Sequence, residues 1–220
     1  MKQQISVGEY DDNIHNHIPH YSQFHLEIVR LVKSRNSDVN NWLDTGCGTG
    51  NLVVYAKKYF PEIHFYLADP DHSMLLKAKD KFSEQNVTLL PECSTDEIST
   101  DVQFDVITAI MCHHYLTVEK KKSALKNCFS SLNRNGIFIT FEHVRSETQE
   151  GLEIALSMMD DFHSSCGVTL AERQKFRERV HQTLFLITAG EYIALLKECG
   201  FRQVELFFRS HLQAGFYAIK

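Results

Sequence analysis

The sequence has no long apolar run. No stretch approaches the roughly 20 consecutive apolar residues that a membrane-spanning helix needs. The first residues, MKQQISVGEYDDN, also lack the apolar core of a signal peptide. We therefore expect a cytoplasmic protein with no membrane partner.

Positive charge is also scarce. The 23 Lys and Arg residues are outnumbered by 28 Asp and Glu residues, which gives a net charge of -5. Nucleic-acid-binding proteins usually gather Lys and Arg on one face. The longest basic run, Lys120 to Lys122, is typical of a solvated helix face. The charge balance disfavours a nucleic-acid partner.

Paired metal ligands are absent as well. The six cysteines contain no CxxC pair, which argues against a zinc cage and a disulfide framework. Early histidines and a His-Cys pair at helical spacing lack a second ligand pair, so we expect no metal site. These residues are His15, His17, His20, His25, His163 and Cys166.

What the sequence does contain is a regular alternation of strand and helix patterns. With 220 residues and 43% apolar content, the chain can bury the core of one domain. The alternation predicts a doubly wound α/β fold with a mostly parallel sheet. Expected strands are 39–44, 64–68, 87–90, 105–111 and 137–141, and expected helices are 24–32, 52–60, 73–82 and 118–132. We expect Asn135-Gly136 to stop the last of these helices.

The alternation is interrupted once. Residues 147–182 carry two helical patterns without a strand between them, which predicts an inserted helical cap. Thr188 and Glu191 have the spacing of a capping box and predict the start of another helix. The end of the chain, 204–219, predicts an antiparallel hairpin. We expect a single domain over 1–220, in which 1–36 forms an N-terminal helical cap segment.

The most informative motif is the glycine turn in WLDTGCGTGNL, which follows the first expected strand. Its register is G-x-G-x-G, whereas a dinucleotide-binding turn has G-x-G-x-x-G and needs glycine where Asn51 stands. Asp44 directly precedes the turn. A carboxylate there repels a pyrophosphate but attracts a sulfonium or an ammonium group. The turn therefore predicts a ligand with positive charge.

A second acid follows the second expected strand. Asp69 in FYLADPDHSML comes about twenty residues after the glycine turn, where a carboxylate can accept hydrogen bonds from both ribose hydroxyls. Pro70 and Met74 could flank an adenine ring. The glycine turn, Asp44 and Asp69 together predict a nucleoside-containing ligand.

At these residues the sequence resembles the class I S-adenosylmethionine-dependent methyltransferases, in motif detail over roughly 38–145 and through the hairpin to the chain end. The resemblance implies a Rossmann-like seven-stranded sheet with an antiparallel last strand, and S-adenosylmethionine as cofactor, with S-adenosylhomocysteine as product. It places Asp44 near the methionine moiety and Asp69 at the ribose. The other residues that it implies along the cofactor are Gly46, Cys47, Gly48, Gly50, Ala109 and Ile110.

The sequence departs from this family after the third strand. LLPECSTDEI stands where many relatives carry a Gly-Asp-Ala turn, so Glu92 and Cys93 replace the residues that reach the adenine. We expect adenine contacts from backbone amides here or from the Ser94 hydroxyl. The segment YDDNIHNHIPHYSQFH is similar to one that closes over the active site in a subset of these enzymes, among them carboxy-S-adenosylmethionine synthases. We assign no specialised activity on this similarity.

Three histidines are candidates for a general base, because they stand at or just after the carboxyl ends of the fourth and fifth strands. They are His113, His114 and His143. Histidines at such strand ends also serve as packing and hydrogen-bonding residues, and this alternative stays open for each.

The sequence thus predicts a methyltransferase that acts on a small-molecule acceptor. Three alternatives remain: a methyltransferase of the tRNA pathway or another macromolecule, a non-catalytic S-adenosylmethionine-binding module, and a nicotinamide dehydrogenase. The acceptor atom and the oligomeric state cannot be inferred from these residues.

Overall fold

The computed structural model describes residues 9–35, 38–82 and 86–220. Its strands are β1 (Asn41–Thr45), β2 (His64–Ala68), β3 (Val87–Leu89), β4 (Phe104–Ile110), β5 (Leu132–His143), β6 (Gln203–Ser210) and β7 (Gln213–Ile219). Its α-helices are α1 (Tyr10–His17), α2 (Tyr21–Ser34), α3 (Asn51–Ala56), α4 (His72–Lys81), α5 (Val118–Ser131), α6 (Gln149–Ser165), α7 (Leu170–Gln182) and α8 (Ala189–Glu198). Two short 3-10 helices, η2 (Thr95–Glu97) and η3 (His113–Tyr115), complete the description.

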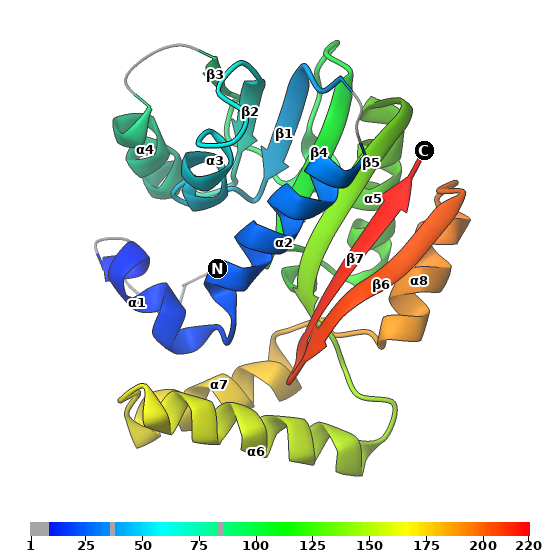
Figure 1. Ribbon diagram of the computed structural model, residues 1–220. Helices are drawn as coiled ribbons and strands as arrows, with labels where there is room; N and C mark the ends of the chain where they lie inside the picture. The colour runs from blue at the N-terminus through cyan, green and yellow to red at the C-terminus, as the bar shows by residue number, and fades with distance from the viewer. Residues whose placement is uncertain (1–8, 36–37, 83–85) are drawn as a thin grey trace.

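The strands form one seven-stranded sheet in the order β3-β2-β1-β4-β5-β7-β6 (Figure 1). Neighbouring strands from β3 to β5 pair in parallel, while β7 runs antiparallel to both β5 and β6. The expected doubly wound, Rossmann-like fold with an antiparallel last strand is confirmed.

Helices cover both faces of the sheet because successive side chains of a strand point to opposite faces. On β5, Phe141 belongs to the core under α2 and α3, and Phe138 belongs to the core under α5 and α8. The ring of Phe24 from α2 stacks on Phe141 with 4.3 Å between ring centroids. Both strand residues are fully buried, which fixes the register of β5 between the two layers.

The junction between α5 and β5 differs from the expectation. Helix α5 ends at Ser131, and β5 begins at once with Leu132, which is fully buried and pairs with Phe104. Asn135-Gly136 therefore lies inside the strand and does not stop the helix. A side chain at Gly136 would place its Cβ 2.9 Å from the carbonyl oxygen of Asn133, so this glycine permits a close approach of backbone.

The expected start of α8 is confirmed. The Thr188 side chain accepts a hydrogen bond from the Glu191 backbone, and the Glu191 carboxylate accepts one from the Thr188 amide. This capping box satisfies free amides at the helix start.

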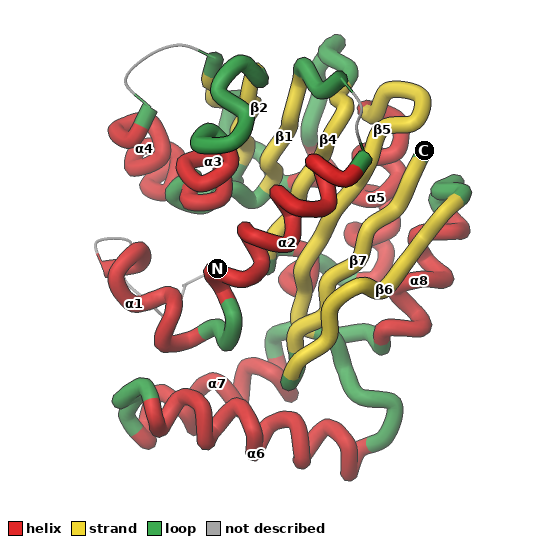
Figure 2. The backbone as a smooth tube through the Cα atoms, viewed as in Figure 1, coloured by secondary structure: helices red, strands yellow, loops and turns green. Residues whose placement is uncertain are grey.

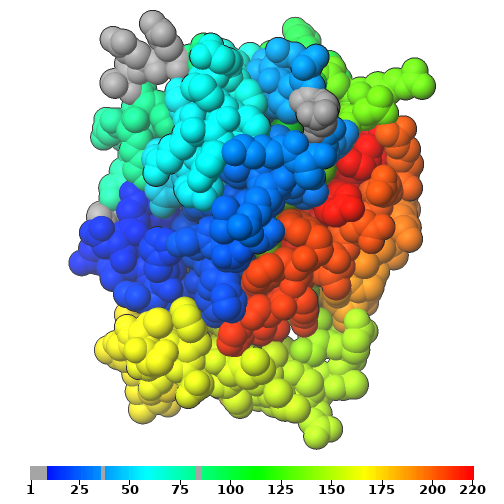
Figure 3. Space-filling view, in the orientation of Figure 1, coloured from blue at the N-terminus to red at the C-terminus, as the bar shows by residue number. Residues whose placement is uncertain are grey.

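Helices α6 and α7 lie beyond the carboxyl ends of the parallel strands, and α1 lies beside them (Figures 1 and 2). The two helices pack on each other and on Leu212 through a separate apolar cluster that includes Leu156, Met159 and Phe176. Figure 3 shows the N-terminal helices, in blue, wedged between the α3–α4 region and this yellow pair. We call α6 and α7 together the cap.

No helix in the described ranges combines the length and the apolar character required to cross a membrane.

Candidate active site

The loops that follow β1, β2 and β4 meet at one edge of the sheet, because parallel strands end at the same side. Ligands of open α/β sheets bind outside this edge. Here the edge faces α1 and the cap (Figure 1).

The glycine turn after β1 uses the left-handed backbone region three times, with φ of +64° at Gly46, +55° at Gly48 and +76° at Gly50. A Cβ at Gly46 would lie 2.5 Å from Cβ of Cys112, and one at Gly50 would lie 2.7 Å from the ring of Phe82. A Cβ at Gly48 would meet nothing within 4 Å. The outer glycines thus allow close packing, while the middle one faces open space, as a ligand cradle requires.

Asp44 is buried at the end of β1, with 2% of its surface exposed. Its Oδ1 accepts a hydrogen bond from the Thr108 hydroxyl at 2.7 Å, and Nε1 of Trp42 donates to the same hydroxyl at 3.0 Å. Burial and the negative charge of Asp69 raise the pKa of Asp44 to about 7, against the effect of the Thr108 bond. A nearby cation would favour the ionised form of Asp44, so the site suits a positively charged ligand group.

Asp69 joins the glycine turn to the start of α4. Its Oδ2 accepts the backbone N–H of Gly48 at 2.8 Å, and its Oδ1 accepts that of Asp71 at 2.8 Å. Burial raises the pKa of Asp69. Each carboxylate oxygen keeps acceptor capacity beyond these single bonds, which leaves room for two ligand hydroxyls.

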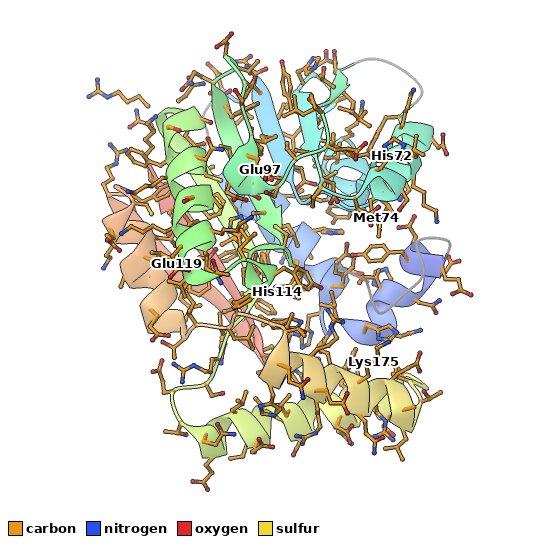
Figure 4. All side chains as sticks on the ribbon, turned by 180° about the vertical axis from the view of Figure 1, so that it is seen from behind. His72, Met74, Glu97, His114, Glu119 and Lys175 are labelled. Carbon is orange, nitrogen blue, oxygen red and sulfur yellow. The ribbon has the colours of Figure 1, made fainter. Side chains whose placement is uncertain are left out.

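The other predicted cofactor residues lie along the same edge. Met74 is buried in the first turn of α4 (Figure 4), whereas Pro70 is exposed. Ala109 and Ile110 end β4, and Cys93 follows β3.

The Ser94 hydroxyl is already engaged. Ser94 caps η2, and its hydroxyl lies within hydrogen-bond distance of Asp96 at 2.5 Å and Glu97 at 2.9 Å. Its proton therefore points to these carboxylates, which leaves only the oxygen lone pairs for a ligand.

The structure separates His113 from the other two candidate histidines. Its Nδ1 lies 3.1 Å from the hydroxyl of Tyr192 on α8, and its ring stacks on Phe138. Burial lowers the pKa of His113 to about 4. Its side chain thus faces the α8 layer and does not face the cap.

His114 lies at the cap side of the edge (Figure 4) and forms a buried pair with Glu142. The distance from Nδ1 of His114 to Oε2 of Glu142 is 2.6 Å. The two carboxylate oxygens also accept the backbone N–H groups of His113 and His114, each at 2.9 Å. Although burial acts in the opposite direction, the His114 ring and these donors lower the pKa of Glu142 to about 2. The ionised Glu142 holds the proton of His114 on Nδ1 and leaves Nε2 as the proton acceptor.

His143 lies beside this pair, with 4.9 Å between its ring centroid and that of His114. Its ring also contacts Phe176 of α7 at 5.7 Å. Burial holds the pKa of His143 well below its usual value, so the ring is neutral. Its Nδ1 is buried and has no hydrogen-bond partner among the described residues.

Helix α1 is fastened to the glycine turn by Asp11. Its carboxylate accepts hydrogen bonds from the Thr49 hydroxyl at 2.5 Å and from the Asn51 amide at 2.9 Å, and it pairs with Lys81 at 2.6 Å. Burial raises the pKa of the neighbouring, partly buried Tyr10, and the nearby Tyr21, Tyr115 and Asp69 raise it further. Helix α1 therefore covers the edge between the glycine turn and η3.

The exit of the cap is tied to the turn that carries His114. The backbone N–H of Phe185, just after α7, donates to the carbonyl oxygen of His114 at 2.9 Å. Nζ of the buried Lys121 donates to the carbonyl oxygens of Phe185 at 2.8 Å and Leu116 at 3.2 Å. The position of η3 and that of the cap are thus coupled.

Sequence reasoning missed three residues of this site. Thr108, Asp11 and Glu142 act through partners that are 28 or more positions away in the chain. A signal existed for Glu142, which stands at the end of a strand directly before His143. Asp11 carried none, because its partners depend on how α1 packs.

In the part of the chain that the structure describes, no three His, Cys, Asp or Glu side chains come together in a way that could hold a metal ion.

Comparison with known proteins agrees with this geometry. The methyltransferase domain family matches residues 43–138, which hold the glycine turn and both buried aspartates. A carboxy-S-adenosyl-L-methionine synthase from Staphylococcus epidermidis is 24% identical over 100% of this chain and 96% of its own length. A protein of the same name from Nautilia profundicola is also 24% identical, over 96% of this chain and 90% of its own.

Solved structures share the fold. A proposed O-methyltransferase from Nostoc punctiforme matches with a TM-score of 0.67 and 19% identity, over 91% of this chain and 56% of its own length. The N-methyltransferase NodS from Bradyrhizobium japonicum, solved with S-adenosyl-L-homocysteine, matches with a TM-score of 0.62 and 15% identity. The match covers 91% of this chain and 87% of NodS. Human N-acetylserotonin methyltransferase, solved with SAM, matches with a TM-score of 0.59 and 14% identity. The match covers 97% of this chain and 53% of the human enzyme.

The chain thus spans little more than half the length of the first and third of these structures. The family match over 43–138, the full-length relatives and the shared fold together support a class I S-adenosylmethionine-dependent methyltransferase.

Proposed function

We propose that the protein transfers a methyl group from S-adenosylmethionine to a small-molecule acceptor. The observation that carries the proposal is the junction of the glycine turn with Asp69, whose two oxygens each hold one backbone N–H and keep capacity for a ribose. Asp44 lies where a carboxylate can attract the cationic methionine end. The open space beside Gly48 fits a ligand that lies against the turn.

The cofactor, when bound, supplies a methyl group already activated by the sulfonium. The protein then has to orient the acceptor, exclude water and remove a proton where the acceptor carries one. His114 is the general base in this proposal, because Glu142 fixes its proton on Nδ1 and leaves Nε2 free to accept another. Glu142 is a positioning residue, since it acts through His114.

We propose further that the described part of the N-terminal segment, 9–35, and the cap within 147–182 close over the acceptor. Asp11 fastens α1 to the glycine turn, and Phe176 of the cap lies against His143. These elements lie outside the cofactor frame and are not basic, which favours a small acceptor over a nucleic acid.

The first experiment is calorimetric titration of the protein with S-adenosylhomocysteine, with NADH as the control ligand. We expect binding of the first and none of the second. Asp69→Ala should weaken binding by at least about a hundredfold, because hydrogen bonds to a charged group are lost. Near-normal affinity in a folded Asp69→Ala protein would refute the site.

Asp105→Ala is the matched control. Asp105 also accepts two backbone N–H groups, those of Asn40 at 2.8 Å and Asn41 at 3.1 Å, but it lies at the opposite edge of the sheet. Equal loss of affinity in both variants would indicate general destabilisation and not a lost ligand contact.

Synthesis of carboxy-S-adenosyl-L-methionine is a second candidate, favoured by relatives of that name whose similarity extends through α1 and the cap. Mass spectrometry of ligand extracted from the purified protein separates the two, since the carboxylated cofactor is heavier than S-adenosylmethionine. A binding module without catalysis is the remaining alternative. Transfer of a labelled methyl group to any acceptor in a small-molecule panel would exclude it.

A further inference from the structure

Two buried polar atoms without partners lie side by side under the cap. Nδ1 of His143 and Oε1 of Gln213 have no hydrogen-bond partner among the described residues. Their side chains are 7% and 0% exposed. His143 and Gln213 are direct cross-strand partners on β5 and β7, so both side chains point to the same face of the sheet.

Such a pair is costly in the absence of a ligand. A buried polar atom without a partner destabilises the folded state, and native proteins leave few of them. The other amide atom of Gln213 makes only a 3.6 Å contact with the sulfur of Met159 on α6, which gives little compensation. A half-rotation of the amide exchanges its nitrogen and oxygen, so the position can offer a donor or an acceptor.

The surroundings decide the charge of the group that fits there. Burial is the main cause of the low pKa of His143, and nearby Arg179 lowers this pKa further while Glu142 raises it. Glu142 is already engaged by His114 and the η3 backbone. The unused hydrogen-bonding capacity of His143 and Gln213, with Arg179 as the neighbouring cation, favours an oxyanion over an ammonium group.

Aromatic side chains define the rest of the space. Phe176 lies against His143, and the ring of Tyr115 lies 4.3 Å from that of His114. The Tyr115 hydroxyl accepts a hydrogen bond from Arg179 of α7 at 3.1 Å. A flat, apolar group could pack against these rings.

We infer that His143 and Gln213 form an acceptor subsite that holds the carboxylate of a small aromatic acid next to His114. The inference rests on the proposed function, because it names the acceptor class of the same site. The N–H groups of His143 and of the rotated Gln213 amide donate to the carboxylate. Phe176 and Met159 cover the subsite, so the cap has to shift when the acid binds.

Calorimetric titration with benzoate as the probe, and benzyl alcohol as its uncharged counterpart, tests the subsite with and without S-adenosylhomocysteine. We expect benzoate to bind at millimolar concentrations and benzyl alcohol to bind at least about tenfold more weakly. Equal binding of the two would overturn the assignment of an anion. Absence of benzoate binding to a protein that binds S-adenosylhomocysteine would overturn the subsite itself.

Gln213→Met supplies a readout that a purely structural role would not give. It removes the partnerless amide, so it should weaken benzoate about tenfold, leave S-adenosylhomocysteine affinity unchanged and not lower the unfolding midpoint in urea. If Gln213→Met is less stable but binds benzoate with unchanged affinity, Gln213 has a structural role only. Gln203→Leu, at an exposed position of β6, is the control. If S-adenosylhomocysteine fails to bind while benzoate binds in a Gln213-dependent manner, the proposed function is wrong and the subsite stands.

Discussion

The Asp44 carboxyl has a pKa of about 7, so it gains or loses its proton in the neutral range. Burial and the charge of Asp69 disfavour the ionised form of Asp44, whereas the hydrogen bond from the Thr108 hydroxyl favours it. A cation that binds beside it reverses this balance, because opposite charges lower the pKa of a carboxyl.

We therefore predict that S-adenosylhomocysteine, through its ammonium group, displaces a proton from Asp44. Calorimetry at pH 6 in buffers with different ionisation enthalpies should show release of close to one proton. Affinity should fall by up to about tenfold per pH unit below 7. Asp44→Asn should release no proton, and Thr108→Val should move the release to higher pH. Identical heats in all buffers would contradict the prediction.

Glu142 gives a second prediction for a single residue. Its folded pKa of about 2 lies below the usual value of 4.5, so it stabilises the fold above pH 4.5 and loses this contribution as pH falls toward 2. Glu142→Gln should lower the free energy of unfolding by about 3 kcal/mol at pH 7.

Urea denaturation at pH 7, 5 and 4 measures the difference in unfolding free energy between the wild type and Glu142→Gln. This difference should become smaller below pH 4.5. The exposed Glu150→Gln serves as the control. A constant difference across the pH series would mean that the lost charge is not its source.

Among the elements, α1 has the most direct link between packing and ligand exchange. Three groups converge on Asp11, from the glycine turn and from α4. Asp11→Ala should release α1 from the turn and raise the dissociation rate of S-adenosylhomocysteine about tenfold, since charge-assisted hydrogen bonds contribute about 1.5–3 kcal/mol each. Stopped-flow displacement measures the rate.

Asp12→Ala, one position along the same helix and exposed, should leave the dissociation rate unchanged. Similar rates in the wild type and Asp11→Ala would show that α1 does not cover the ligand.

Elements with strong local patterns were predictable from the sequence, and those set by tertiary packing were not. Strand β2 occupies the expected positions, because its apolar residues stand between clear turn signals. Strand β5 begins five residues before the expected position, since burial of Leu132 outweighs the turn propensity of Asn135-Gly136. The motif residues Asp44 and Asp69 were likewise found by spacing, whereas Asp11 required knowledge of how α1 docks.

At the scale of the whole molecule, buried histidines make stability depend on pH. Burial lowers the pKa of His25 and His113 to about 4, from 6.5. The unfolded chain therefore binds more protons than the folded one between these values, so the free energy of unfolding falls as pH drops through this window. The raised pKa of Asp44 acts in the opposite direction, which makes a comparison of variants the cleanest test.

His25→Phe keeps a ring against Tyr21, 4.8 Å away, and removes the titrating group. The fall in unfolding free energy between pH 7 and pH 5 should be smaller by about 2 kcal/mol in this variant. Guanidinium denaturation at both pH values measures it, with His72→Phe as an exposed control. If the unfolding free energy falls by the same amount in His25→Phe and in the wild type, His25 is not protonated on unfolding.

The hydrogen bond from Phe185 to the carbonyl oxygen of His114 has a consequence for the fidelity of the reaction. The chain leaves the cap at Phe185, so a shift of α7 that admits an acceptor also pulls on the turn that orients the proposed base. The base regains its position only when the cap has closed again. Under the proposed function, water that enters the open pocket would meet a displaced His114, which would protect the methyl group from hydrolysis.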